Sequence, residues 1–321
     1  MKCKICKNEK ENKEFKVREM MFGSRDKFIY FQCANCGCLQ IKDIPEDISQ
    51  YYPLNYYSFN ISHNKFENPI KLLAKRLRNH YAIFNKGVIG KLIYGYFPYD
   101  SLRSLSRIKL TKDPKILDVG CGSGNLLYAL KKLGFKNLLG VDPYIEKDIN
   151  YQNGLGILKK TVHEISGEYD LIMFHHSFEH ISDPVETLCS VQKLSAPNGI
   201  CLIRIPIIDS WAWENYGANW VQIDAPRHLF LHSRKSMDII AQKAGFKIKE
   251  IICDSTEFQF WGSEQYKRDI PLNSENSYSV NPSKSIFSKR EIRIFKEKAK
   301  KLNSESRGDQ VAFYLKKFDK I

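Results

Sequence analysis

The sequence predicts an α/β protein, in which a Rossmann-like sheet of seven strands follows a small module with four cysteines. From Lys115 onward, short apolar runs alternate with amphipathic helical segments, a pattern typical of a parallel sheet. Residues 1–40 hold five of the nine cysteines, four of them in two C-x-x-C pairs. We therefore divide the chain into a cysteine module (1–45), a basic helical connector (46–112) and an α/β core (113–321). The core contains a substrate loop and an insertion, at 207–232 and 255–309.

The apolar runs of the core fix the expected strands and helices. The strands are expected at Lys115–Val119, Leu138–Val141, Gly156–Lys160, Tyr169–His175, Gly199–Ile205, Phe246–Cys253 and Gln310–Leu315. Helices are expected at Asn125–Leu133, Pro184–Leu194, Ser236–Ala244 and Ser288–Leu302. Asp183 is a natural N-cap, and Pro184 suits the first helical position after it. Residues 69–97 have mixed apolar and basic positions at helical spacing.

Charge and composition indicate a globular protein with a strongly basic segment. The net charge is +14, and no apolar run is long enough to span a membrane. We expect a cytoplasmic protein without a disulfide framework. Between Lys65 and Lys112 the only acidic residues are Glu67 and Asp100. This segment is either a solvated helical face or a surface that attracts an anionic substrate or the phospholipid headgroups of the inner membrane.

The segment from Leu117 to Asn125, with the sequence LDVGCGSGN, lies at an expected strand-to-helix turn. Its glycines, Gly120, Gly122 and Gly124, allow a sharp turn and close backbone approach to a ligand. The next strand ends in Asp142, where a carboxylate accepts hydrogen bonds from ribose hydroxyls. The dinucleotide fingerprint requires glycine where Asn125 stands, and Asp118 would repel a pyrophosphate. Asp118 suits a cationic ligand, so S-adenosylmethionine is the expected cofactor.

These motifs resemble those of class I S-adenosylmethionine-dependent methyltransferases, from about Lys115 to the C-terminus. Residues 118–124 are similar to the first motif of the family, and residues 168–184 to its fourth-strand motif, which ends in Glu-His and Asp-Pro. The resemblance implies cofactor contacts at Thr161 and Val162, where the family often has an acidic residue near the adenine. We also assign His175 to the cofactor and His176 to the substrate, because both follow the fourth strand.

A general base is needed if the acceptor is a hydroxyl, because a hydroxyl is a poor nucleophile at neutral pH. Histidine suits this task, and Glu179 beside His180 could orient or stabilise an imidazole. In the sugar C-methyltransferases that this chain resembles, the matching pair is implicated in deprotonation, and in some quinone O-methyltransferases in holding a divalent cation. The alternative is that Glu179 and His180 only cap and pack the following helix. His228 is the second candidate for the base.

The loop at 207–232 contains three tryptophans together with Asn, Asp, Arg and His. Aromatic faces and planar hydrogen-bonding groups suit sugar rings, so we assign Trp220 and Asp224 to substrate binding. Arg227 is a candidate for contacting an anionic group such as a diphosphate. The alternative is a lid that only packs over the cofactor.

Cys3, Cys6, Cys33 and Cys36 form two C-x-x-C pairs at a spacing typical of zinc ribbons. We expect a structural zinc ion, with a redox disulfide as the alternative and Cys38 as an extra thiol. A ribbon ahead of this core, followed by a tyrosine-rich connector, resembles methyltransferases of bacterial sugar and surface-polysaccharide pathways. The terminal residues 308–315 are similar to the closing strand of that group.

The favoured function is therefore methyl transfer to a nucleotide sugar or glycan. O-methylation is favoured over C-methylation, because this chain has no counterpart of the further C-terminal domain in the ribbon-bearing C-methyltransferases. Methylation of a lipid or quinone is the alternative within the same class of enzyme. A non-catalytic scaffold or nucleic-acid-binding protein is the alternative outside it, although nucleic acid is an unlikely partner because no recognised RNA-binding module is present.

Overall fold

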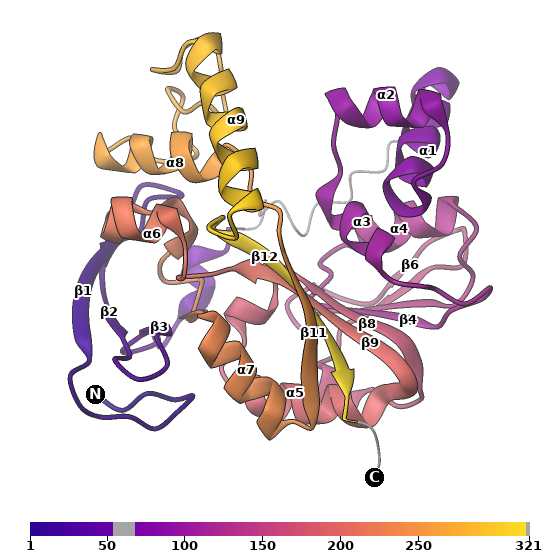
Figure 1. The fold of residues 1–321 in the computed structure, drawn as a ribbon, viewed down its shortest axis with the longest axis horizontal. Helices are drawn as coiled ribbons and strands as arrows, with labels where there is room; N and C mark the ends of the chain where they lie inside the picture. The colour runs from indigo at the N-terminus through magenta and orange to yellow at the C-terminus, as the bar shows by residue number, and fades with distance from the viewer. Residues whose placement is uncertain (54–67, 319–321) are drawn as a thin grey trace.

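The computed structural model describes residues 1–53 and 68–318, and within these ranges the strands form two sheets (Figure 1). The larger sheet has the order β11-β12-β9-β8-β4-β5-β7-β6. Its strands are β4 (Ile116–Val119), β5 (Leu138–Val141), β6 (Ile149–Asn150), β7 (Gly156–Leu158), β8 (Tyr169–His175), β9 (Ser195–Pro206), β11 (Phe246–Cys253) and β12 (Gln310–Lys317). All seven expected strands are present. The short edge strand β6 is an eighth, so the expected count was one too low.

The central strands β7, β5, β4, β8 and β9 are parallel, and β12 runs antiparallel between β9 and β11. Figure 1 shows helices on both faces of this sheet. One face packs against α5 (Pro184–Leu194) and α7 (Arg234–Lys243), and the other against α4 (Asn125–Lys132). The helix α7 begins two residues before the expected start, because the Ser233 side chain caps it by accepting from the Ser236 amide.

Residues 69–97 form two helices, α1 (Pro69–Phe84) and α2 (Val88–Tyr96), and α3 (Asp100–Ser104) follows. Ala82 and Ile83 of α1 and Leu102 of α3 are buried with residues of α4 and the sheet. Part of the expected tyrosine-rich connector, from Leu54, lies outside the described residues. Within the described part of the chain, no helix is both long and apolar enough to cross a bilayer.

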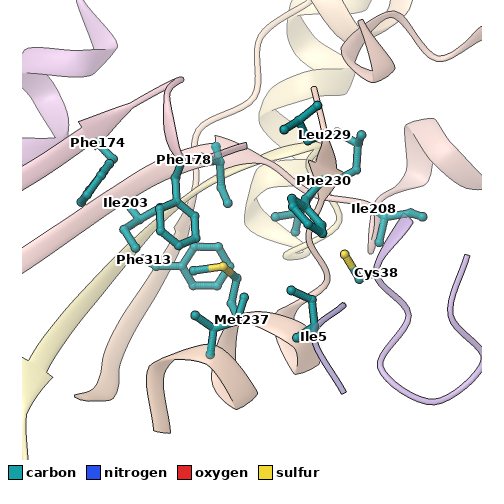
Figure 2. Packing of buried hydrophobic residues seen from close by; sticks show 14 of the residues in the cluster. Ile5, Cys38, Phe174, Phe178, Ile203, Ile208, Leu229, Phe230, Met237 and Phe313 are labelled. Carbon is teal, nitrogen blue, oxygen red and sulfur yellow. The ribbon is translucent and has the colours of Figure 1, made fainter. Parts of the chain in front are cut away.

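The cysteine-rich N-terminus is continuous with the core rather than a separate body. Its strands β1 (Lys13–Arg18), β2 (Lys27–Gln32) and β3 (Leu39–Ile41) form an antiparallel sheet, and β10 (Phe230–Leu231) of the core pairs with β3 as the fourth strand. Figure 2 shows Ile5 and Cys38 close to Phe230 and to Met237 of α7, in one hydrophobic cluster. The strand β10 was not expected from the sequence, because two residues are too few to show an alternating pattern.

The insertion between β11 and β12 holds α8 (Phe258–Lys267) and α9 (Lys289–Ser304), and α6 (Trp211–Tyr216) lies in the expected substrate loop. Phe260 of α8 packs against Phe295 of α9 at 5.3 Å between ring centroids. The helix α9 agrees with the expected basic helix to within two residues, whereas α8 was not expected.

Candidate functional site

A cavity of about 540 Å³ lies where the order of the parallel strands reverses, between β4 and β8. Ligands of open α/β sheets bind at such a point, outside the carboxyl ends of the strands. The cavity is lined by residues that follow four strands: Gly120 after β4, Asp142 after β5, Thr161 and Val162 after β7, and His176 and His180 after β8. These six residues were all predicted to belong to the site.

The glycine loop makes its sharp turn with three left-handed residues, Gly120, Gly122 and Gly124, at φ of +71°, +55° and +76°. At Gly120 a Cβ atom would lie 2.4 Å from Cβ of Ser177, which donates to the carbonyl of Val119. The loop from β4 therefore packs directly against the residue that follows β8, and a side chain at Gly120 would force them apart.

Asp142 and Asp118 occupy different depths of the site. The Asp142 carboxylate lines the cavity and accepts from the amides of Gly122, at 2.8 Å, and Tyr144, at 2.9 Å. Asp118 is only 2% exposed and is not among the residues that line the cavity. Burial, together with the nearby Asp142, raises the pKa of the Asp118 carboxyl. Asp142 is thus the carboxylate within reach of a bound nucleoside.

His175 ends β8 but does not line the cavity, so its assignment to the cofactor finds no support in this geometry. Both of its ring nitrogens are enclosed without a hydrogen-bond partner in the described residues, and burial lowers its pKa. His176 turns back toward the cavity with φ of +53°, a strained conformation for a residue with a side chain. Its Nε2 lies 2.8 Å from Nη1 of Arg204, which donates to it.

Glu179 is fully buried behind the cavity wall, and among the described residues neither carboxylate oxygen has a hydrogen-bond partner. His176 Nδ1 lies 3.5 Å and His228 Nε2 lies 3.8 Å from Oε1 of Glu179. Burial opposes ionisation of Glu179, but the contact with His176 and the charge that the neighbouring histidines carry when protonated outweigh it and lower the pKa of Glu179 to about 2. An ionised carboxylate without hydrogen bonds is costly to bury, so this position calls for an explanation beyond packing.

The rings of His180 and His228, which lie beside this carboxylate, each turn Nδ1 toward a backbone carbonyl. His180 Nδ1 and His228 Nδ1 each lie 2.8 Å from a backbone carbonyl, those of Arg227 and Gln222. Because a carbonyl only accepts, each Nδ1 carries a proton, and in the neutral form of either ring Nε2 is the atom that accepts a proton. One atom each from Glu179, His180 and His228 lies within 4.8 Å of the others, a separation that would also suit a metal ion.

His180 is the member of this group that lines the cavity, with His228 behind it at 4.7 Å between ring centroids. Burial lowers the pKa of His180, and the neighbouring His228 adds to this effect. His180 is therefore neutral at pH 7 and able to accept a proton, which makes it the better placed of the two predicted bases.

Arg227 lines the cavity, but most of its guanidinium donors are used inside the protein, so its predicted contact with an anionic substrate stays a prediction. The side chain is 0% exposed, and Nη2 donates to Glu19 at 2.8 Å and to Asp224 at 2.6 Å. Nη1 donates to the carbonyl of Tyr51 at 3.1 Å. These bonds and that of Nε to Asp224 use four of its five N–H donors, so Arg227 holds the loop in place, while its own carbonyl orients His180.

Asp224 and Trp220, the other two predicted substrate contacts in this loop, are not among the residues that line the cavity. Asp224 bonds to Arg227, and although burial opposes its ionisation, Arg227 outweighs this and lowers its pKa. Trp220 is 0% exposed, and its indole N–H donates to the Asp309 carboxylate at 2.9 Å. The ring of Trp220 therefore packs inward, away from the cavity.

Sequence reasoning missed the contribution of the N-terminal third to this cavity. Ile44, Ile48 and Tyr52 form part of its wall, and the rings of Tyr52 and Tyr144 are nearly parallel, at 7°, with centroids 6.3 Å apart. Glu19 anchors Arg227 from the cysteine module and accepts four backbone amides, from Met21, Phe22, Gly23 and Ser24. No local pattern could have paired residues 208 positions apart.

The four cysteines of the two C-x-x-C pairs come together as predicted. Their sulfur atoms all lie within 4.8 Å of one another, with Cys3–Cys36 at 3.6 Å and Cys6–Cys33 at 3.4 Å. These separations exceed a disulfide bond and are close to the roughly 3.8 Å between ligands in a tetrahedral zinc–thiolate site. Gln40 Nε2 donates to Cys3 Sγ at 3.2 Å, as is typical of a group that supports a metal ligand.

Residues 94–251 match the family model described as "Methyltransferase domain". The chain is 29% identical over 159 residues to a ubiquinone biosynthesis O-methyltransferase of Psychrobacter arcticus, covering 43% of this chain and 61% of that protein. It is 27% identical over 159 residues to the protein of the same name from Acinetobacter baylyi, covering 43% and 65%. The chain thus spans about three fifths of the length of these relatives.

Two solved structures also align with the chain. A cyclopropane synthase of Mycobacterium tuberculosis aligns over 78% of this chain and 99% of its own at 13% identity, with a TM-score of 0.42. A methyltransferase of Archaeoglobus fulgidus aligns over 78% and 100% at 18% identity, with a TM-score of 0.40. The part of the chain that matches a methyltransferase domain thus contains the glycine loop and most of the residues that line the cavity, which supports an S-adenosylmethionine-dependent methyltransferase.

Proposed function

We propose that the chain methylates a hydroxyl group on a flat, aromatic acceptor of the quinol type. The observation that carries this proposal is that neutral His180 lines a cavity whose wall also contains several apolar side chains. These are the side chains of Ile44, Ile48, Ile181 and Leu229. Beside them lie the nearly parallel rings of Tyr52 and Tyr144. The printed name of the curated relatives fits such an acceptor.

The chemistry is an in-line displacement in which bound S-adenosylmethionine supplies an electrophilic methyl group. The acceptor O–H gives its proton to Nε2 of His180, and its oxygen forms the new bond to the methyl carbon as the carbon–sulfur bond breaks. The departing thioether is neutral, so the only proton to be moved is the one His180 takes. The fixed Nδ1–H bond to the Arg227 carbonyl and the nearby Glu179 carboxylate stabilise the resulting imidazolium.

His180→Gln tests the base. We expect kcat to fall about 10²–10⁴-fold, while the affinity for S-adenosylmethionine in calorimetry stays unchanged. His80→Gln, on α1 and outside the cavity, is the matched control and should keep full activity. An unchanged kcat in His180→Gln would contradict the assignment. Activity lost on chelation and restored by Mg²⁺ alone would instead assign Glu179, His180 and His228 to a catalytic cation.

Methylation of a nucleotide sugar or glycan is the second candidate, and the polar rim of the cavity favours it. Lys160, Asp183 and Glu186 lie there and offer hydrogen bonds to hydroxyl groups. Transfer of labelled methyl into fractionated cell extract separates the two candidates. Label in quinones or other phenolic lipids supports the first, whereas label in nucleotide sugars or polymeric glycan supports the second.

We also propose that Cys3, Cys6, Cys33 and Cys36 hold a structural zinc ion. The short distances between their sulfur atoms and the Gln40 contact support this assignment. Elemental analysis of the purified chain should find one zinc per molecule, which Cys6→Ser and Cys33→Ser should lose. Cys38→Ala is the control, because Cys38 Sγ faces His232 rather than the cluster and its loss should leave the zinc in place. Zinc retained in both serine variants would refute the site.

A further inference from the structure

The hairpin of α1 and α2 exposes an apolar surface that the proposed reaction does not use. Ile70, Leu73, Val88, Ile89 and Leu92 are 77%, 58%, 76%, 62% and 61% exposed. Single exposed aliphatic residues are common on soluble proteins, but contiguous groups of them mark interaction sites. On α2, Val88, Ile89 and Leu92 recur at helical spacing and so share one face.

The two helices present these residues together. A groove of about 590 Å³ lies between them, with Leu73 and Leu77 of α1 on one side and Val88 and Ile89 of α2 on the other. The helices α1 and α2 pack closely at Gly90, where a Cβ atom would lie 2.4 Å from the carbonyl oxygen of Leu77. Because the backbones are this close, rotation of α2 to bury its apolar face is sterically blocked.

The same hairpin is uniformly basic. Residues 69–97 contain no Asp or Glu and six cationic residues: Lys71, Lys75, Arg76, Arg78, Lys86 and Lys91. The other basic helix, α9, is different in both respects. Its Lys296, Lys300 and Lys301 lie within 4 Å of glutamates, and its apolar face packs against α8. Exposed aliphatic groups in a basic segment that contains no Asp or Glu are therefore particular to α1 and α2 among these two basic segments.

A second cavity, of about 500 Å³, lies beside the apolar groove, between α1 and α4. Its lining includes Lys75, Arg76 and Arg78 of α1 and Lys132 of α4, and among the described residues no carboxylate lines it. Leu73 and Arg76 also line the apolar groove, so the cavity and the groove share a wall. Burial lowers the pKa of Arg78, which means that an anion in this cavity would stabilise its charge. The cavity is suited to the phosphate of a lipid headgroup.

We propose that the α1–α2 hairpin docks the enzyme on a membrane surface that contains anionic phospholipid. The aliphatic groups of Ile70, Leu73, Val88, Ile89 and Leu92 enter the boundary between headgroups and acyl chains. The lysines and arginines contact lipid phosphates, one of them in the cavity between α1 and α4. Nucleic acid fits less well, because it offers phosphates but no hydrocarbon for five exposed aliphatic side chains.

Co-sedimentation of the full chain with vesicles tests this surface. The wild-type chain should bind vesicles of phosphatidylglycerol mixed with phosphatidylcholine and should not bind phosphatidylcholine alone. The apolar variant Val88→Ser/Ile89→Ser/Leu92→Ser and the charge variant Lys71→Gln/Arg76→Gln/Lys91→Gln should both lose binding at least tenfold. One basic residue near an anionic surface contributes roughly fivefold in affinity, so three account for such a loss.

The charge-matched control is Arg290→Gln/Lys300→Gln/Lys301→Gln on α9, which should bind vesicles as the wild type does. All substituted residues are exposed, and S-adenosylmethionine affinity and circular dichroism should be unchanged in every variant. Failure of the wild type to bind anionic vesicles would overturn the proposal, as would full binding by the serine variant. Tighter binding to duplex RNA or DNA than to vesicles, lost in the charge variant alone, would assign the surface to nucleic acid instead. None of these outcomes depends on which acceptor is methylated.

Discussion

Arg227→Met should destabilise the chain by about 3 kcal/mol, because it removes the cation from a buried group of two carboxylates. Breaking a buried ion pair by removing one partner costs about 3–5 kcal/mol. The lower end applies here for two reasons. Glu19 keeps its four backbone amide donors, and the Asp224 side chain is 15% exposed and can recruit water.

Urea unfolding followed by circular dichroism measures this effect. With an m-value of about 3 kcal/mol/M, the midpoint should fall by about 1 M. The double variant Glu19→Gln/Arg227→Met should lose less than the sum of the two single variants, because they share one interaction. Arg25→Met is the matched control: its ion pair with Asp269 is exposed, at 45% and 50%, and the midpoint should not move.

The same substitution reports on catalysis. With the Arg227 side chain gone, the loop that carries the carbonyl bonded to His180 is held less firmly, so kcat should fall more than the affinity for S-adenosylmethionine. A midpoint within about 0.3 M of the wild type would refute the reasoning, since it would mean that the buried guanidinium contributes no net stability.

Three further substitutions test the cofactor loop, the ribose contact and the buried imidazoles. Gly120→Ala should weaken S-adenosylmethionine binding more than tenfold in calorimetry, because the new Cβ atom would clash with Ser177. Gly134 also has a positive φ but faces open space, so Gly134→Ala is the control and should bind the cofactor as the wild type does. Equal effects of the two substitutions would contradict the packing argument. Asp142→Ala should weaken binding about 10–100-fold by removing charged hydrogen bonds, and unchanged affinity would mean that the carboxylate does not contact the cofactor. Burial lowers the pKa of His232 to about 4 in the folded chain. Below about pH 6.5 the unfolded chain therefore binds a proton at His232 that the folded chain does not bind. The free energy of unfolding should therefore fall by up to about 3 kcal/mol between pH 6.5 and 4. His232→Phe should reduce this fall in thermal melts, and an identical pH dependence in the variant would show that His232 is not responsible.

The core was predictable because its signals are local. Each parallel strand is a short apolar run followed by a glycine, a carboxylate or a cap, and Gly120, Asp142 and His180 sit at the ends of such runs. Since the carboxyl ends of parallel strands meet at one edge of the sheet, these residues had to converge. The cysteine pairs were equally local, as each forms its own turn.

The packing of the loop at 207–232 was harder to predict, because side-chain composition does not reveal which way a loop packs. Trp220 was expected to face a sugar, yet the fold brings Asp309 beside it from 89 positions away to accept its indole proton. Arg227 was expected to bind an anion from outside, and Glu19 binds it from within. The short strand β10 was missed because its partner, β3, lies in a different segment of the chain.

The pairing of β3 with β10 means that the boundary between module and core does not follow the order of the chain. The strand β10 begins two residues after His228, so the backbone that carries a candidate catalytic residue completes its hydrogen bonds in the N-terminal sheet. Removing residues 1–45 would leave an unpaired strand edge beside the cavity and expose Phe230. A chimera that takes its N-terminal module from a related enzyme should therefore fold only if residues 224–233 come from the same enzyme as the module.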